Sequence, residues 1–171
     1  AALLSGELDR IGALCENDFL LCCPLRAPAR LVSALRRMGA LGASMMLYFK
    51  GIAQDFHDLD LMIVNEDASI AQRILSEMGV LQPSVPNPKY KSKMFLEFVI
   101  DGIDVDLIAG FAIVSGATIH DCSLRREQIV EKVSFEGEVI PLQSPALWRE
   151  YYLLMGRNEK AALIDRASPR T

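Results

Sequence analysis

The clearest pattern in the chain is a pair of short apolar segments that are interrupted by acidic residues and joined by an Asp-Gly step. Residues 95–100 and 103–108 are rich in β-branched and aromatic residues, and Asp101-Gly102 separates them. Two such segments joined by these two residues predict a β-hairpin with a type I′ turn. In that register Glu97 faces Asp106, so we expect acidic side chains to gather on one face of the hairpin.

Further elements are predicted on the N-terminal side of this hairpin. Apolar residues recur at three- and four-residue steps over 27–38 and 68–78, which predicts amphipathic helices that end at Gly39 and Gly79. We expect Gly79 to adopt the positive φ that is common just after a helix. Residues 57–64 alternate acidic and apolar positions before a continuous apolar run, which predicts a strand.

The C-terminal part predicts a strand followed by helices. A turn at residues 136–137 leads into an alternating segment that ends at Leu142. Ser144-Pro145 suits the N-cap and first position of a helix that ends near Gly156, and residues 159–166 predict another helix. The whole pattern predicts an α/β (α+β) fold, with a short mixed β-sheet flanked by helices and with C-terminal helices packed beside it.

Length and composition indicate one globular domain. The chain has 171 residues, of which 51% are hydrophobic and 23% are charged. This is one domain's length and enough apolar material for a core. We therefore expect a single domain over residues 1–171, in which residues 1–26 are not assigned to any element and residues 143–171 hold the C-terminal helices.

Charge and cysteine content limit the expected partners and compartment. The formal net charge of −4 gives no general attraction to nucleic acid or to an anionic membrane, so we expect neither as a partner. The longest uncharged stretch, residues 107–120, is shorter than the ~18 residues that a membrane-spanning helix needs. The four cysteines form no CxxC motif, which favours a reducing, cytoplasmic setting.

Two Asp-x-Asp pairs carry the candidate chemistry, one on each of two predicted strands. Side chains two residues apart on a strand project from the same face. Such carboxylates repel one another unless a cation lies between them, and Mg²⁺ or Mn²⁺ prefers these oxygen ligands. A solvated acidic strand edge without a metal is the alternative that the residues alone leave open. The predicted metal ligands are Asp58, Asp60 and Asp106, with Asp104 and Glu97 as further candidates.

The order of these residues resembles that of the minimal nucleotidyltransferases of the DNA polymerase beta-like superfamily. In that family a Gly-Ser pair precedes an Asp-x-Asp strand, and a single carboxylate follows on a later strand. The resemblance covers roughly residues 41 to 166 and implies a nucleotidyltransferase-like fold. The corresponding segments here are Ala43-Ser44, Gly51, His57-Asp58-Leu59-Asp60, residues 97–106, residues 138–142 and residues 153–160.

This resemblance implies an activity and a role for each matched residue. The protein would use Mg²⁺ or Mn²⁺ to transfer a nucleoside monophosphate from a nucleoside triphosphate such as ATP to an acceptor hydroxyl, with release of pyrophosphate. The acceptor would be a small molecule or a protein. Asp58 and Asp60 would bind the metal, and Asp106 would complete the site and assist the attacking hydroxyl. The implied nucleotide-binding residues are Gly42, Ala43, Ser44, Arg157 and Lys160.

One residue departs from the family pattern. The first residue of the expected Gly-Ser pair is Ala43 here, although Gly42 precedes it. Either the loop shifts by one residue so that Gly42 takes the glycine's role, or the loop is impaired. The second case predicts a catalytically inactive binding or regulatory protein, such as a component of a toxin–antitoxin pair. A structural metal-binding domain is a third interpretation.

Overall fold

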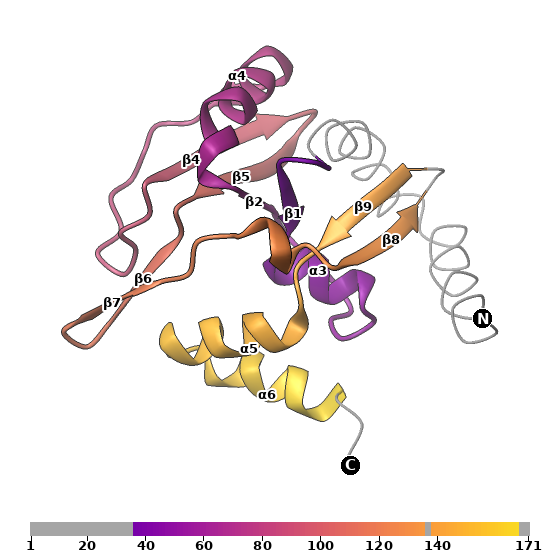
Figure 1. Ribbon diagram of the computed structural model, residues 1–171, viewed down its shortest axis with the longest axis vertical. Coiled ribbons are helices and arrows are strands. Elements are labelled where there is room, and N and C mark those ends of the chain that lie inside the picture. Colours follow the sequence, from indigo (N-terminus) through magenta and orange to yellow (C-terminus); the bar gives the residue numbers. More distant parts are fainter. Residues whose placement is uncertain (1–35, 136–137, 168–171) are drawn as a thin grey trace.

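The structure of the protein, a computed structural model, describes residues 36–135 and 138–167. A mixed sheet with helices on its two faces dominates it (Figure 1). The strands are β1 (Gly39–Leu41), β2 (Leu59–Ile63), β3 (Val80–Leu81), β4 (Met94–Ile100), β5 (Ile103–Ala109), β6 (Ala112–Ser115), β7 (Thr118–Asp121), β8 (Glu131–Phe135) and β9 (Glu138–Leu142). The helices are α3 (Ala43–Phe49), α4 (Ala68–Met78), α5 (Pro145–Leu154) and α6 (Asn158–Ala167), with short 3₁₀ turns η1 (Asn65–Asp67) and η2 (Arg126–Gln128).

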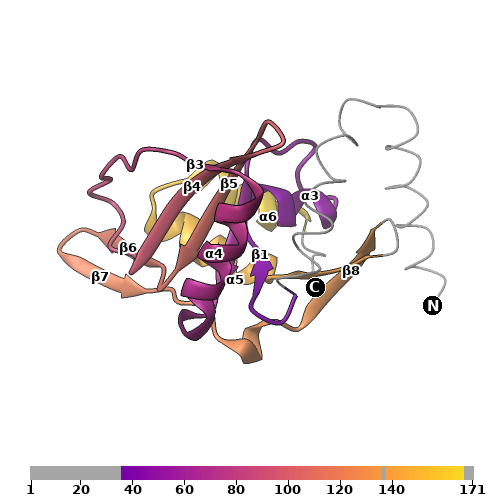
Figure 2. The same ribbon diagram turned by 90° about the horizontal axis from the view of Figure 1, so that it is seen from above.

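The seven strands of the main sheet follow the order β3-β4-β5-β2-β1-β9-β8, and β6 and β7 form a separate hairpin. β2 lies in the middle and pairs parallel with β5 but antiparallel with β1. Helix α4 packs on one side of β4 and β5, and α5 and α6 lie on the other side (Figure 2). This arrangement confirms the predicted fold class, a mixed sheet with C-terminal helices.

The predicted hairpin is present in the expected register. β4 and β5 pair from Ile100↔Ile103 outward, so that Glu97 lies opposite Asp106. Asp101 and Gly102 have φ values of 51° and 80°, which are the positive values that both central residues of a type I′ turn require. The local sequence therefore predicted both the turn and the register of this hairpin correctly.

Other elements differ from the expectation at their ends. β2 begins at Leu59, because Leu59↔Val105 is the first pair that it forms with β5, so Asp58 lies one residue before the strand. The sequence analysis did not predict β3, β8 or the β6–β7 hairpin. Residues 36–38 form a turn, and the rest of the helix predicted over 27–38 lies outside the described residues, as does the turn at 136–137.

The helix predicted over 68–78 is confirmed, but the expected conformation of Gly79 is wrong. Gly79 has φ −153°, which is extended backbone. A glycine is needed there for space instead. A Cβ atom on Gly79 would lie 2.5 Å from the carbonyl oxygen of Val99 and 2.5 Å from Cγ1 of Ile100. The chain leaves α4 in close contact with the end of β4.

We expect Gly79→Ala to lower the free energy of unfolding by about 1–3 kcal/mol, since the backbone of Val99 cannot move aside as a flexible side chain could. Urea denaturation measures the change. Glu77→Ala, an exposed position on the same helix, should change it by less than about 0.5 kcal/mol. Equal stability of the Gly79→Ala variant and the unaltered protein would refute the steric explanation.

The C-terminal helices are held against the sheet by their aromatic side chains. Ser144 caps α5 by accepting a hydrogen bond from the Leu147 amide at 3.3 Å, as predicted. Trp148 and Tyr152 of α5 are 3% and 0% exposed and belong to the core. In the part of the chain that the structure describes, none of the helices has the length and apolar character needed to cross a membrane.

Candidate functional site

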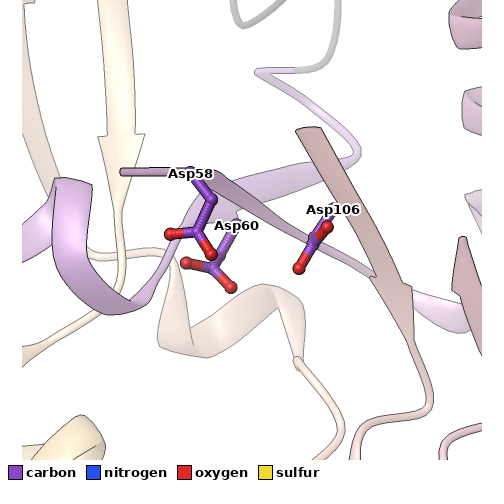
Figure 3. A group of neighbouring side chains, drawn as sticks. All are labelled: Asp58, Asp60 and Asp106. Atoms are coloured by element: carbon purple, nitrogen blue, oxygen red, sulfur yellow. The ribbon is translucent and has the colours of Figure 1, made fainter. Parts of the chain in front are cut away.

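Three carboxylates from two adjacent strands meet on the face of the sheet where α5 and α6 pack. Asp60 on β2 and Asp106 on β5 are register partners, and Asp58 lies just before β2. One oxygen atom from each of the three lies within 4.8 Å of the others, and all three residues are half-buried. Figure 3 shows Asp58 and Asp60 beside each other and Asp106 approaching from the neighbouring strand. We call this group the carboxylate triad.

Burial and mutual repulsion shift the titration of the triad. Burial, followed by the charges of Asp58 and Asp106, raises the pKa of Asp60 to about 8, although Lys160 and Arg157 act in the opposite direction. Burial, followed by the charge of Asp58 and other carboxylates on the hairpin, raises the pKa of Asp106 to about 7. A cation between these oxygens would relieve this repulsion.

Glu97 and Asp104, the further candidate ligands, lie outside the triad. Both add to the negative charge that acts on Asp106. They line a separate cavity of about 330 Å³ that also reaches Asp58 and Asp106. His57, which the sequence places next to the triad, lines that cavity too. The structure thus places these groups beside the triad rather than within it.

The φ angles of Gly42 and Ala43 bear on the two alternatives that the sequence left open for the loop before α3. Ala43 has φ +40°, which lies in the left-handed region that costs a non-glycine residue about 1–2 kcal/mol. Gly42 has φ −112°, and a Cβ atom there would lie 2.4 Å from Cζ2 of Trp148. Ala43 takes the glycine-like conformation, and Gly42 allows α5 to approach closely.

Ser44 connects this loop to the triad. Its hydroxyl donates a hydrogen bond to Oδ1 of Asp58 at 3.2 Å. The amide of Gly42 donates to the carbonyl oxygen of Asp60 at 3.0 Å, which fixes the loop against β2. Ser44 is therefore positioned to orient the carboxylate of Asp58, and both residues line the same cavity.

The triad opens into a cavity of about 150 Å³ between the sheet and the C-terminal helices. Ala43, Ser44, Arg157 and Lys160 line it, so four of the five predicted nucleotide-binding residues surround one space, and Gly42 is outside the lining. Arg157 lies one residue before α6, and Lys160 lies in its first turn. The triad thus adjoins two cavities, this one with the cationic wall of Arg157 and Lys160 and another lined by the carboxylates of Glu97 and Asp104.

One wall of this cavity is aromatic, which the sequence did not predict. Tyr90, Phe95, Phe111 and Trp148 line it together with Met155, and the rings of Tyr90 and Phe95 are nearly parallel, with 7° between their planes and 6.3 Å between centroids. Tyr90 follows the proline-rich loop and carries no periodic signal. An aromatic residue that ends a loop before a strand is the only hint the sequence offered.

Comparison with known proteins supports the fold assignment. The chain is similar to a solved structure from Thermotoga maritima that is described as a putative nucleotidyltransferase, with 25% sequence identity and a TM-score of 0.65. The similarity covers 83% of this chain and 90% of that chain. No protein-family model matches the chain, and no curated protein matches it. The protein has a nucleotidyltransferase-like fold with an acidic triad that could bind a divalent metal.

The shifted pKa values predict how stability depends on pH. In the folded protein the pKa values of Asp60 and Asp106, about 8 and about 7, exceed the ordinary value of 3.8. The native state therefore holds more protons than the unfolded state between these values, and the free energy of unfolding falls as pH rises through that range.

Chelator-treated protein should lose about 1.4 kcal/mol of unfolding free energy per pH unit for each of the two carboxyl groups between about pH 5 and that group's folded pKa, and the loss should level off above about pH 8. Asp60→Asn should reduce this slope, because one of the two groups no longer titrates. Urea denaturation at a series of pH values measures both proteins. Parallel pH profiles for the two would show that Asp60 does not titrate in this way.

Proposed function

We propose that the protein is a Mg²⁺-dependent nucleotidyltransferase that moves a nucleoside monophosphate from a nucleoside triphosphate to an acceptor hydroxyl and releases pyrophosphate. The observation that carries this proposal is the triad itself, three carboxylate oxygens within 4.8 Å of one another, beside a cationic cavity wall. A fold similar to that of a putative nucleotidyltransferase supports it. ATP is the first donor to test.

The donor set fits a divalent cation with a preference for oxygen. Three half-buried carboxylates leave coordination positions that phosphate oxygens and water can complete. Bound there, Mg²⁺ would neutralise negative charge on the triphosphate and polarise the phosphorus that is attacked. The triad carboxylates repel one another without a cation, and each would then be paired with the bound cation. Because the cation favours the ionised form, the raised pKa values of the triad should fall on binding.

The protein's own groups supply the remaining steps. Arg157 and Lys160 line the cavity and would hold the phosphates that leave as pyrophosphate. Asp106 borders both cavities, so it can accept the proton of the acceptor hydroxyl as the hydroxyl oxygen forms its bond to the α-phosphorus. The bond between that phosphorus and the oxygen bridging to the β-phosphate then breaks.

The acceptor would enter through the second cavity that adjoins the triad. The cavity of about 330 Å³ that adjoins Asp58 and Asp106 also has Glu97, Asp104 and His57 in its lining. Its volume suits a small molecule, and its carboxylates favour an acceptor that carries positive charge over an anionic one such as nucleic acid. The charges that line the two cavities would therefore separate the two substrates.

Asp60→Asn should abolish metal-dependent transfer without unfolding the protein, since it removes a ligand charge and keeps the shape. Release of pyrophosphate and transfer of label from α-labelled ATP to acceptors in a cell extract measure the activity, and circular dichroism measures folding. Asp101→Asn is the matched control: it makes the same chemical change on an exposed turn, where Asn-Gly is equally suited. Full activity of Asp60→Asn would remove Asp60 from the mechanism.

Arg157→Gln and Lys160→Gln should each weaken the affinity for a nonhydrolysable ATP analogue with Mg²⁺ by about tenfold, because a charge-assisted hydrogen bond is lost. Isothermal titration calorimetry gives the affinities. Lys132→Gln, an exposed lysine on β8 and outside the cavity, should leave the affinity unchanged. Equal losses in all three variants would indicate only a general effect of net charge.

The second candidate function is that of a catalytically inactive binding or regulatory protein. The observation that favours it is the φ of +40° at Ala43, a strained alanine in a loop where the resembling family has glycine. The same calorimetric titration, with and without Mg²⁺, separates the two. Mg²⁺-dependent binding of the analogue supports the enzyme, and no detectable binding at millimolar concentration supports the inactive protein.

A further inference from the structure

A buried hydroxyl without a partner lies close to the triad. Tyr152 is 0% exposed, and its phenolic oxygen has no hydrogen-bond partner among the residues that the structure describes. Leaving a buried hydroxyl unbonded is costly, so such groups normally have a partner in the protein, in water or in a ligand. The missing partner of Tyr152 therefore calls for an explanation.

Tyr152 lies directly behind the lining of the triad cavity: it is not itself a lining residue, but its ring centroid is 5.5 Å from that of Trp148, which is. The charged groups that act most strongly on the Tyr152 phenol are Asp60, Arg157 and Asp58, and all three line that cavity. The ammonium group of Lys160, also in the lining, lies 5.5 Å from the centre of the Tyr152 ring. Burial raises the pKa of Tyr152, so the phenol keeps its proton and can act as a donor.

The neighbouring residue, Tyr151, is also buried, but its hydroxyl has a hydrogen-bond partner. The Tyr151 hydroxyl, on a residue 6% exposed, donates a hydrogen bond to the carbonyl oxygen of Cys122 at 3.3 Å. The groups that act on it, Cys122, Asp121 and Arg125, are not in the lining of the triad cavity. Two consecutive tyrosines of α5 are thus both buried, but within the described part of the chain only Tyr151 has a hydrogen bond from its hydroxyl.

We propose that the Tyr152 hydroxyl donates a hydrogen bond to an oxygen atom of the ligand that occupies the triad. That oxygen belongs to a nucleotide phosphate or to water around the divalent cation. The inference rests on the proposed function and adds to it a neutral donor from α5, next to the cations Arg157 and Lys160. A neutral O–H group can bind such an oxygen without adding charge beside the acidic triad.

Tyr152→Phe removes only the hydroxyl and tests this directly. The melting temperature of the ligand-free variant should stay the same or rise, because an unbonded buried hydroxyl is lost. Its affinity for Mn²⁺, or for Mn²⁺ with a nonhydrolysable ATP analogue, should fall by about tenfold. A loss with Mn²⁺ alone identifies cation-associated water as the partner, and a loss only with the nucleotide present identifies a phosphate oxygen.

Tyr151→Phe is the matched control, since it makes the same change one residue away. It should lower the melting temperature by about 2–4 °C, because the Cys122 carbonyl loses its donor, and it should leave both affinities unchanged. Should Tyr152→Phe instead lower the melting temperature with unchanged affinities, the hydroxyl would have a structural role only and the inference would be wrong. Loss of both stability and affinity in Tyr152→Phe would also contradict it.

The outcomes separate this inference from the function on which it rests. If the unaltered protein binds neither Mn²⁺ nor the nucleotide, the proposed function and the inference both fail. If it binds them and Tyr152→Phe binds them equally well, only the inference fails. A second measurement uses the unaltered sequence, labelled with 3-fluorotyrosine and observed by ¹⁹F NMR. The ligand-induced change in chemical shift should be larger for Tyr152 than for Tyr151. Equal changes would contradict the inference.

Discussion

The parallel pairing of β2 with β5 is the constraint on which the rest of the site depends. Asp60 and Asp106 are register partners in that pair. The backbone pairing of the two strands therefore holds their carboxylates side by side. The apolar residues that follow both, including Leu61 and Leu107 at 2% and 0% exposed, fix the register, because a slip of one residue would bury the aspartates and expose the core. Core packing therefore maintains an electrostatic repulsion that a bound cation would relieve.

The C-terminal helices add the complementary half of this arrangement. Trp148 and Tyr152 anchor α5 in the core, which is why Gly42 has no room for a side chain. The chain then turns into α6 and brings Arg157 and Lys160 to the triad cavity, where they oppose the raised pKa of Asp60. Positive charge thus comes from the helices and negative charge from the sheet, and the two meet in the cavity only when both layers pack together.

The sequence predicted best those features that depend on residues close together in the chain. The β4–β5 hairpin followed from its Asp-Gly turn, and the three triad residues followed from the Asp-x-Asp spacing, because both signals lie within a few residues. The β6–β7 hairpin and β8 were missed. Their strands are four and five residues long. The hairpin turns at Gly116-Ala117, where a glycine with φ 60° in the first central position suits a type II′ turn, so a local signal was present there and was overlooked. Gly79 was misread because its role depends on Val99, which is distant in sequence. The aromatic cavity wall and the orphan hydroxyl of Tyr152 arise only from tertiary contacts.

Ala43 shows that a departure from a family's sequence pattern can be interpreted only when the backbone conformation at that residue is known. From residues alone, alanine in place of glycine suggests a loop that has lost its conformation. In the structure Ala43 keeps a φ of +40°, the Gly42 amide stays bonded to the Asp60 carbonyl, and Ser44 still reaches Asp58. The Ala43 methyl group is 8% exposed and packs in the core, so its burial offsets part of the backbone strain. The strained alanine therefore does not break the contacts between this loop and the triad.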